Sequence, residues 1–218
     1  MSFSTKVKEE IGRHLSRSRH CRIAELLALV LATGEVSFRD GTVELHLKPE
    51  NELISKKLCL LIDVLFERQI QYELSDKCIK ITNQDMVDRV LQTIKLYDYV
   101  DFLEEDWLDE DELMAIEDDT VTYVSSHGIS LQNCQFPKQV IQKDCCKKAF
   151  LRGIFLATGS VSDPSKAYHF EIVVRNKDMA ASVQEVMQSF LLDAKVVKRK
   201  KYYIVYLKEG AMIVDMLK

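Results

Sequence analysis

A segment near the start of this chain recurs beyond its middle. Residues 21–37 (CRIAELLALVLATGEVS) and residues 146–162 (CKKAFLRGIFLATGSVS) are identical at nine of seventeen positions, at a constant offset of 125. Such a repeat constrains the fold more than composition does, because each copy has to form the same structural unit. The chain is therefore expected to contain two related halves.

The residues after each copy of the repeat also correspond. Each copy is followed by a strand pattern, an amphipathic helix, two short alternating strands and a closing helix. The strand, helix and strand pair fall at residues 42–48, 51–66, 70–74 and 77–82 in the first half, and at 168–175, 177–192, 195–199 and 202–208 in the second. This order predicts an α+β fold of two pseudo-symmetric repeats with antiparallel sheets.

Small side chains mark one face of the repeated helix. They recur every four residues, at Ala24, Ala28 and Ala32 in the first copy and at Ala149, Gly153 and Ala157 in the second. Such rows let two helix backbones approach closely, so the two helices are expected to pair in the core. The alternative, two unrelated alanine-rich helices, does not account for the matched spacing. Gly34 and Gly159 follow, and a left-handed glycine is expected to end each helix.

Charge is distributed unevenly along the chain. Residues 101–119 hold eleven acids and no base, and the remaining 30 bases and 23 acids give the rest of the chain a net charge of +7. A basic remainder favours a polyanionic partner, although the same charge also serves solubility. These features divide the chain into a basic N-terminal arm or helix (1–20), a first repeat (21–96), an acidic linker or insertion (97–144) and a second repeat (145–218).

The composition is typical of a globular chain. Apolar residues make up 47% of the sequence, so a core can form without disulfides. The six cysteines show no CxxC and no spacing typical of a zinc site, and adjacent Cys145 and Cys146 are poorly placed for joint chelation. Reduced, mostly packed thiols are expected, with no metal or other cofactor. No apolar run reaches the roughly 18 residues of a membrane span, so a cytoplasmic protein without a membrane partner is predicted.

Residues 151–161 (LRGIFLATGSV) resemble a degenerate LAGLIDADG motif, which forms the helix pair of homing endonucleases. More specifically, three blocks resemble the bacterial WhiA family of transcription regulators, which are linked to sporulation and cell division. The blocks are MSFSTKVKEEI (1–11), KDCCKKAFLRGIFLATGSVSDP (143–164) and YHFEIVV with KRKKYYIVYLKEGAMIVDML (168–217). The resemblance implies a LAGLIDADG-like fold. The family continues into a C-terminal helix-turn-helix domain that is expected to read DNA sequence, whereas this sequence stops at Lys218 and its linker is longer and more acidic than in the family.

The resemblance also bears on catalysis. Homing endonucleases of this architecture end each motif helix with an acid that holds a catalytic metal. The corresponding residues here are Thr33 and Thr158, whose neutral hydroxyls are poor magnesium ligands and are expected to bond to the preceding helical turn. Glu35 has no acidic counterpart, since its equivalent is Ser160. The sequence therefore predicts a protein that is not an enzyme.

The second repeat ends in a basic segment, KVVKRKKYYIVYLK (195–208), with six bases and no acid. Lysine and arginine neutralise phosphates, and tyrosines can lie against sugar or base. Strand alternation predicts one face for the core and an opposite face that carries Tyr202, Tyr206 and Lys208. The candidate DNA-binding residues are Lys147, Lys148, Arg152, Lys195, Lys198, Arg199, Lys200, Lys201, Tyr202, Tyr206 and Lys208, supported by the arm residues Lys6, Lys8, Arg13, Arg17 and Arg19.

Alternatives remain open for this segment and for the whole chain. A hairpin with KRKK at its tip is also what a solvated turn tolerates, and Glu44 and Glu171 are expected to meet phosphates poorly. Three functions compete: a non-catalytic DNA-binding regulator module in cell division, chromosome segregation or sporulation, a protein-interaction platform, and an active endonuclease. Salt-dependent duplex binding favours the first, saturable binding to a protein without DNA affinity the second, and magnesium-dependent nicking the third.

Overall fold

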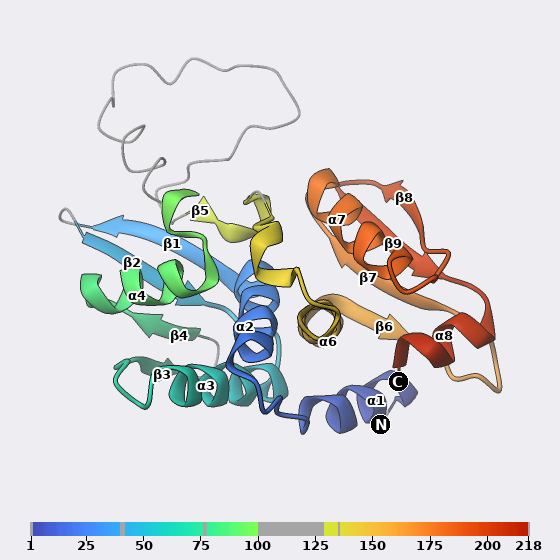
Figure 1. Cartoon of the computed structure of the whole chain (residues 1–218), viewed down its shortest axis with the longest axis horizontal. Coiled ribbons are helices and arrows are strands. Elements are labelled where there is room, and N and C mark those ends of the chain that lie inside the picture. The colour runs from blue at the N-terminus through green and yellow to red at the C-terminus, as the bar shows by residue number, and fades with distance from the viewer. Residues whose placement is uncertain (1, 40–41, 76–77, 100–128, 135, 218) are drawn as a thin grey trace, which may run out of the picture.

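A computed structural model describes residues 2–39, 42–75, 78–99, 129–134 and 136–217 (Figure 1). The acidic segment 101–119 lies outside these residues. The first half contains α2 (Arg19–Thr33), β1 (Gly34–Arg39), β2 (Thr42–Leu47), α3 (Glu52–Leu65), β3 (Glu73–Ser75), β4 (Cys78–Ile81) and α4 (Gln84–Ile94). The second half contains α6 (Asp144–Thr158), β6 (Gly159–Val161), β7 (Phe170–Val174), α7 (Lys177–Gln188), β8 (Lys195–Arg199), β9 (Tyr202–Leu207) and α8 (Gly210–Leu217).

Both halves follow the order αββαββα, as the repeat predicts. The first sheet has the strand order β3-β4-β2-β1-β5 and the second β6-β7-β9-β8, so the four repeated strands take equivalent places. All the pairings are antiparallel. The predicted α+β class with two pseudo-symmetric repeats is therefore confirmed.

Equivalent asparagines begin the second helix of each half. The Asn51 side chain accepts a hydrogen bond from Ile54 N at the start of α3. Asn176, which is 125 residues further on, accepts from Asp178 N and Met179 N at the start of α7. Each cap satisfies backbone donors that the first helical turn leaves free, and such a cap typically contributes about 1 kcal/mol. The repeat thus extends to the local signals that set helix boundaries.

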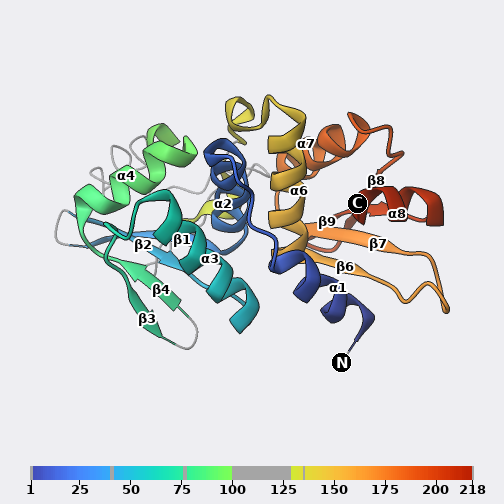
Figure 2. The same cartoon turned by 60° about the horizontal axis from the view of Figure 1, so that its bottom comes forward.

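The helices α2 and α6 lie side by side at the centre of the molecule, with one sheet on each side (Figures 1 and 2). The predicted pairing of these helices through their small residues is confirmed. The Gly153 backbone approaches α2 so closely that an added Cβ would lie 2.7 Å from the Glu25 carbonyl oxygen. Because α2 is covered by α6 on one side and by the first sheet on another, nearly its whole length is buried.

The glycines that end the core helices do so for a reason that the sequence did not indicate. Gly34 has φ −83° and ψ 146°, and Gly159 has φ −86° and ψ 161°, so both are extended and begin the strands β1 and β6. The expectation of left-handed glycines is wrong. Space is the constraint instead, since an added Cβ would lie 2.5 Å from Val30 O at Gly34 and 2.2 Å from a Phe155 ring carbon at Gly159.

The C-terminal part of the expected linker is integrated into the fold. Residues 129–130 form β5 (Ile129–Ser130), which pairs with β1, and two short 3-10 helices follow at Leu131–Asn133 and Lys138–Ile141. The buried residues of this stretch include Ile129, Leu131, Cys134, Phe136, Pro137 and Ile141. Within the expected linker or insertion of 97–144, apolar residues from about 129 onwards therefore pack into the core.

The N-terminal segment forms α1 (Phe3–Gly12), which is capped by the Ser2 side chain and packs against α3, α6 and β6. Figure 2 shows α1 crossing one end of the helix pair. Among the described residues, no helix combines the length and the apolar character that a membrane crossing requires.

Candidate functional site

The basic segment 195–208 forms the hairpin of β8 and β9 at the free edge of the second sheet. Lys200 and Lys201 make the turn, and Lys200 has a positive φ of 55°. Val205 and Leu207 are buried on the face that packs toward α7, as alternation predicts, whereas Tyr203 on that face is half-buried and Ile204 on the opposite face is buried as well. The opposite face of this sheet is turned away from α7.

Basic and aromatic residues gather on that opposite face. Tyr206 is paired with Lys195 on the neighbouring strand, and Tyr202 with Arg199. The Lys208 ammonium lies 5.3 Å from the centre of the Tyr206 ring, and the Arg175 guanidinium lies 6.0 Å from that of Tyr202. We call this surface the outer face of the second sheet, and define it by Lys195, Arg199, Tyr202, Tyr206 and Lys208. Arg175, which was not among the residues predicted to bind DNA, lies on the same face.

Lys198 lies on the other side of the sheet. It pairs with Tyr203, and its ammonium lies 5.7 Å from the centre of the Tyr203 ring. Since residues one apart on a strand point to opposite faces, Lys198 and Arg199 cannot reach the same flat surface. Of the four bases in residues 198–201, Lys198 and Arg199 therefore lie on opposite faces of the sheet, and the other two form the turn.

The glutamates of the two sheets have partners. On β7, Glu171 accepts from Ser160 Oγ at 3.0 Å, and its other carboxylate oxygen lies 3.1 Å from His169 Nε2. On β2, Glu44 lies 3.0 Å from Lys80 Nζ and 3.1 Å from His46 Nε2. Burial alone would raise the pKa of Glu44, but hydrogen bonds from Lys80 and His46 lower it below its usual range. These contacts offset the negative charge that the sequence analysis expected to oppose phosphates.

The remaining candidates from the second repeat lie elsewhere. Lys147 and Lys148 project from the first turns of α6, and both ammonium groups lie within 6.0 Å of the centre of the Phe190 ring, just after α7. This position is on the α7 side of the second sheet, away from the outer face. The structure therefore does not bring these two lysines together with Lys195 and Arg199.

Arg152 is held by a buried ion cluster between the two core helices. Its Nε and Nη2 atoms each donate to a Glu25 carboxylate oxygen at 3.1 Å, and Nη2 also donates to Ser16 Oγ at 2.8 Å. Lys57 Nζ lies 3.0 Å from the same carboxylate and also donates to the carbonyl oxygens of Gly12 and His14. The proposed phosphate contact of Arg152 is corrected, because its guanidinium joins the two halves.

The basic residues of the N-terminal arm differ in their exposure to solvent. Lys6, Arg13, Arg17 and Arg19 are exposed. Lys8 instead lies over the Phe155 ring, 5.8 Å from its centre, and burial lowers its pKa. Lys8 therefore helps to pack α1 against α6, which leaves the exposed members of the arm for electrostatic contact.

Threonine hydroxyls end the paired helices, as the sequence predicts. Thr33 Oγ1 donates to Leu29 O at 2.7 Å, and Thr158 Oγ1 donates to Ile154 O at 3.1 Å. Glu35 lies just beyond Thr33, with one oxygen 2.7 Å from Lys48 Nζ and the other buried without a hydrogen bond. Within the described residues, no group of three or more histidine, cysteine, aspartate or glutamate ligands forms around these helix ends.

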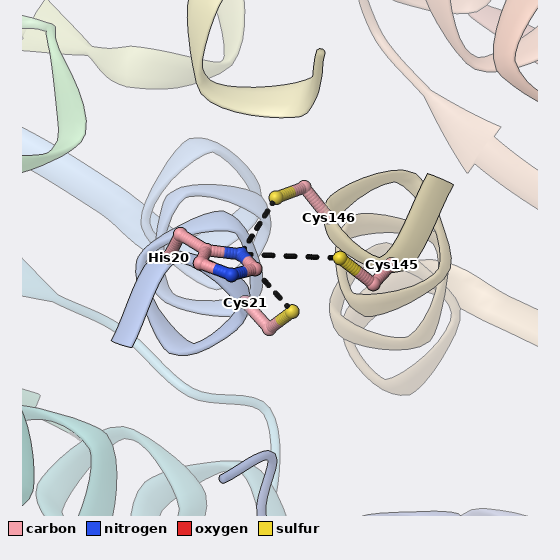
Figure 3. A group of neighbouring side chains, drawn as sticks. All are labelled: His20, Cys21, Cys145 and Cys146. Carbon is pink, nitrogen blue, oxygen red and sulfur yellow. Dashed lines mark hydrogen bonds between the residues drawn. The ribbon is translucent and has the colours of Figure 1, made fainter. Parts of the chain in front are cut away.

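The opposite ends of the same helices bring four potential ligands together (Figure 3). His20 and Cys21 belong to the first turn of α2, and Cys145 and Cys146 to the first turn of α6. The His20 Nδ1 atom lies 3.4 Å from the sulfur of Cys21, 3.9 Å from that of Cys145 and 3.2 Å from that of Cys146. We call these four residues the cysteine cluster.

The cluster is not evident from the sequence, because its members are distant in the chain. The two pairs are adjacent residues separated by more than a hundred positions, so no ligand spacing is visible. The repeat itself carried the signal, since the offset of 125 aligns His20 with Cys145 and Cys21 with Cys146. Paired helices then have to bring both pairs together at one end.

Cys21 and Cys146 are buried, whereas His20 and Cys145 are exposed. Burial, together with hydrogen bonding to the neighbouring Cys145 thiol, raises the pKa of Cys21 to about 12. Burial also raises the pKa of Cys146. Both buried thiols are therefore protonated at neutral pH when no metal is bound.

Two αββαββα halves around a closely packed helix pair define a protein with the LAGLIDADG homing-endonuclease fold. A profile described as the WhiA LAGLIDADG-like domain matches residues 147–218. The resemblance of this chain to the WhiA family is thereby confirmed. A protein of Lachnoclostridium phytofermentans (strain ATCC 700394 / DSM 18823 / ISDg), named probable cell division protein WhiA, is 40% identical over 219 residues. That match covers 100% of this chain and 64% of the relative, so the chain spans less than two thirds of its length.

Solved structures show the same fold. The crystal structure of the N-terminal LAGLIDADG domain of DUF199/WhiA matches 99% of this chain and 88% of that chain, with a TM-score of 0.62 and 18% identity. A variant of the homing endonuclease I-DmoI in complex with its target DNA matches 91% of this chain and 96% of that chain, with a TM-score of 0.52 and 16% identity. The relationship to homing endonucleases therefore concerns the fold.

Proposed function

We propose that this chain is a DNA-binding module of a WhiA-type regulator and that it does not cleave the DNA it binds. Relatives named as probable cell division proteins support a role in the control of cell division, and the resemblance of the sequence extends the proposal to chromosome segregation and sporulation. The observation that carries the DNA-binding proposal is the outer face of the second sheet, where basic residues alternate with tyrosines on paired strands.

The outer face has the chemistry for backbone contact with a duplex. Lysine and arginine side chains supply charge for phosphates, and the two tyrosine rings offer flat surfaces beside them. The Lys195 ammonium lies 2.7 Å from Asp193, but both side chains are more than half exposed, so this pair is readily exchanged for a phosphate. Such contacts do not depend on base identity, and the module is expected to bind duplexes of different sequence alike.

The absence of cleavage in this proposal rests on the helix ends. A metal-dependent nuclease needs carboxylates that hold a divalent cation near the scissile phosphate. Thr33 and Thr158 offer hydroxyls that are already bonded to their own helices, and the nearby Glu35 has a neutral counterpart in Ser160. Support for a regulator also comes from the names of the relatives.

The test compares two triple variants with the same change in charge. In the first, Lys195, Arg199 and Lys208 become serine. In the control, Lys56, Lys138 and Lys198 become serine, which removes exposed bases that lie off the outer face. The first variant should bind duplex DNA more weakly and flatten the dependence of log K on log salt by about one unit per lost contact, up to about three. Equal losses in both variants would reject the outer face as the binding surface.

A second candidate function is docking of a protein partner on the same face. An apolar row formed by Val173, Ile204 and Val197 crosses the outer face between its two basic rows. The Val197 side chain is 45% exposed. An apolar side chain does not bind phosphate, so DNA binding does not account for its exposure. If this row binds a protein, Val197→Ser should weaken capture of that partner and leave duplex affinity unchanged, whereas the basic triple variant should do the reverse.

A further inference from the structure

The cysteine cluster is a second site that the proposed DNA contacts do not use. We propose that His20, Cys21, Cys145 and Cys146 bind one Zn²⁺ ion, which ties the first turn of α2 to the first turn of α6. In Figure 3 the three sulfur atoms lie on one side of the His20 ring, around Nδ1, two of them on residues of α6 and one on a residue of α2. Each helix contributes two adjacent residues at positions that the internal repeat makes equivalent.

The distances between the donor atoms agree with a tetrahedral zinc site. Bond lengths of about 2.3 Å to sulfur and about 2.0 to 2.1 Å to nitrogen require a nitrogen and a sulfur ligand to lie about 3.6 Å apart. The distances from His20 Nδ1 to the three sulfurs are 3.2, 3.4 and 3.9 Å, on both sides of that value. All four donor atoms lie within 4.8 Å of one another. Shifts of a few tenths of an ångström close the nitrogen–sulfur distances, and the most widely separated sulfurs have to approach by up to about 1 Å to reach the roughly 3.8 Å of a tetrahedral site.

The donor set favours zinc over the harder cations. Three thiolates and one imidazole make a combination found in structural zinc sites, whereas magnesium and calcium take oxygen ligands. Binding displaces a proton from each of the three thiols to solvent, so that three sulfur anions and a neutral imidazole face the cation. Both ligand pairs lie in the first turn of a helix.

Four protein ligands fill the coordination shell of the ion, so the proposed site is structural. It lies at the N-terminal ends of α2 and α6, opposite the ends where Thr33 and Thr158 lie. Within the described residues, the cysteine cluster is the one group of three or more histidine, cysteine or acidic ligands that could hold a metal ion. Because each helix begins its own half of the fold, the metal would hold the two sheets at a fixed orientation.

The test measures metal in the purified 218-residue protein. Protein from cells supplied with zinc is expected to carry one zinc ion per chain by elemental analysis. Cys145→Ser changes an exposed ligand and should remove most of this zinc, and His20→Gln should do likewise at the other exposed ligand. Cys59→Ser and Cys78→Ser are matched controls outside the cluster and should retain the full zinc content. Circular dichroism spectra establish that each variant is folded.

Cobalt provides an independent readout. Co²⁺ added to the zinc-free protein should give the absorption bands of a tetrahedral thiolate site. Cys145→Ser should lower cobalt affinity by more than the roughly 10 to 100-fold that loss of an outer-shell partner costs. Zinc should raise the melting temperature of the wild type and of both controls, but not that of Cys145→Ser.

Several results would overturn the proposal. These are a zinc content far below one per chain in the wild type, a zinc content that Cys145→Ser leaves unchanged, or a loss of zinc in the Cys59 and Cys78 controls. The site is independent of the proposed DNA contacts, so the outer-face triple variant should retain its zinc.

Discussion

Gly153 on α6 and Ala28 on α2 lie in close contact across the pair of core helices. A Cβ added at Gly153 would lie 2.8 Å from the Ala28 Cβ and 2.7 Å from the Glu25 carbonyl oxygen. The nearest of these neighbours is backbone, which cannot rotate away as a side chain does. The packing distance of the two halves therefore depends on the absence of a side chain at this one position.

Larger residues at this contact should destabilise the protein. Gly153→Leu or Ala28→Leu is expected to cost about 1 to 3 kcal/mol or more, because extra atoms force the helices apart. Denaturant unfolding of each variant measures the loss. Ala181→Leu serves as control, since Ala181 is exposed on α7 and the substitution keeps the residue helical. Variants that unfold with the parent would show that the helix contact is not tightly packed.

Substitution in the ion cluster at Glu25 should also lower the free energy of unfolding. Glu25→Gln removes the charge that faces both Lys57 and Arg152, and leaves the buried Lys57 ammonium without its anion. Breaking a buried pair in this way typically costs about 3 to 5 kcal/mol. Glu52→Gln is the control, because the exposed pair of Glu52 with Lys56 contributes little. Equal stability of the Glu25 and Glu52 variants would show that the cluster does not support the helix pair.

The same variant should acquire a pH dependence. Burial lowers the pKa of Lys57, and the charge of Glu25 raises it, so Glu25→Gln should lower it further. Lysine in the unfolded chain then binds its proton more tightly than Lys57 does in the folded protein. Stability should therefore rise with pH between the lowered pKa and the ordinary lysine value. Unfolding midpoints measured from neutral to alkaline pH test this, and a slope no steeper than that of the parent would contradict it.

The fold could be predicted from the sequence because the repeat carries it. Small residues around Ala28 and Gly153 indicate the helix pair, and alternation in residues 195–208 indicates which face of β9 is buried. Local signals were less reliable. In the sequence, Gly34 resembles a glycine that caps a helix. Its conformation is instead set by the nearby Val30 carbonyl and by the strand that it begins, and neither can be predicted from a glycine at one position.

The candidate site could be predicted only in part, since contacts between the halves decide it. The sequence alone indicates that Arg152 is a surface base. The structure shows that it pairs with Glu25 on the neighbouring core helix. Lys198 and Arg199 read as one basic run, and only strand pairing separates their faces. The cysteine cluster depends on helices whose ligands are distant in the chain, so neither pair alone suggests a metal.

Glu44 should make stability depend on acidic pH. Hydrogen bonds from Lys80 and His46 hold its folded-state pKa below the unfolded value, despite the opposing effect of burial. Its stabilising contribution is therefore present above the unfolded pKa and is lost as pH falls through the lowered folded pKa. Glu44→Gln should be less stable than the parent at neutral pH, with the difference shrinking in acid. The exposed Glu10→Gln is the control, and a difference that stays constant with pH would contradict the prediction.

The helix ends lead to a prediction about cleavage. In-line attack on a phosphodiester requires a cation held where the nucleophile forms, and hydroxyls of Thr33 and Thr158 that bond to Leu29 and Ile154 cannot hold it. Supercoiled plasmid incubated with the purified protein and magnesium or manganese should therefore remain uncut at salt concentrations where duplex binding is measurable. Glu35 offers the nearest test of an alternative, because one of its oxygens is buried without a hydrogen bond. If the wild type nicks the plasmid and Glu35→Gln does not, one carboxylate suffices for cleavage. The protein would then be an active endonuclease.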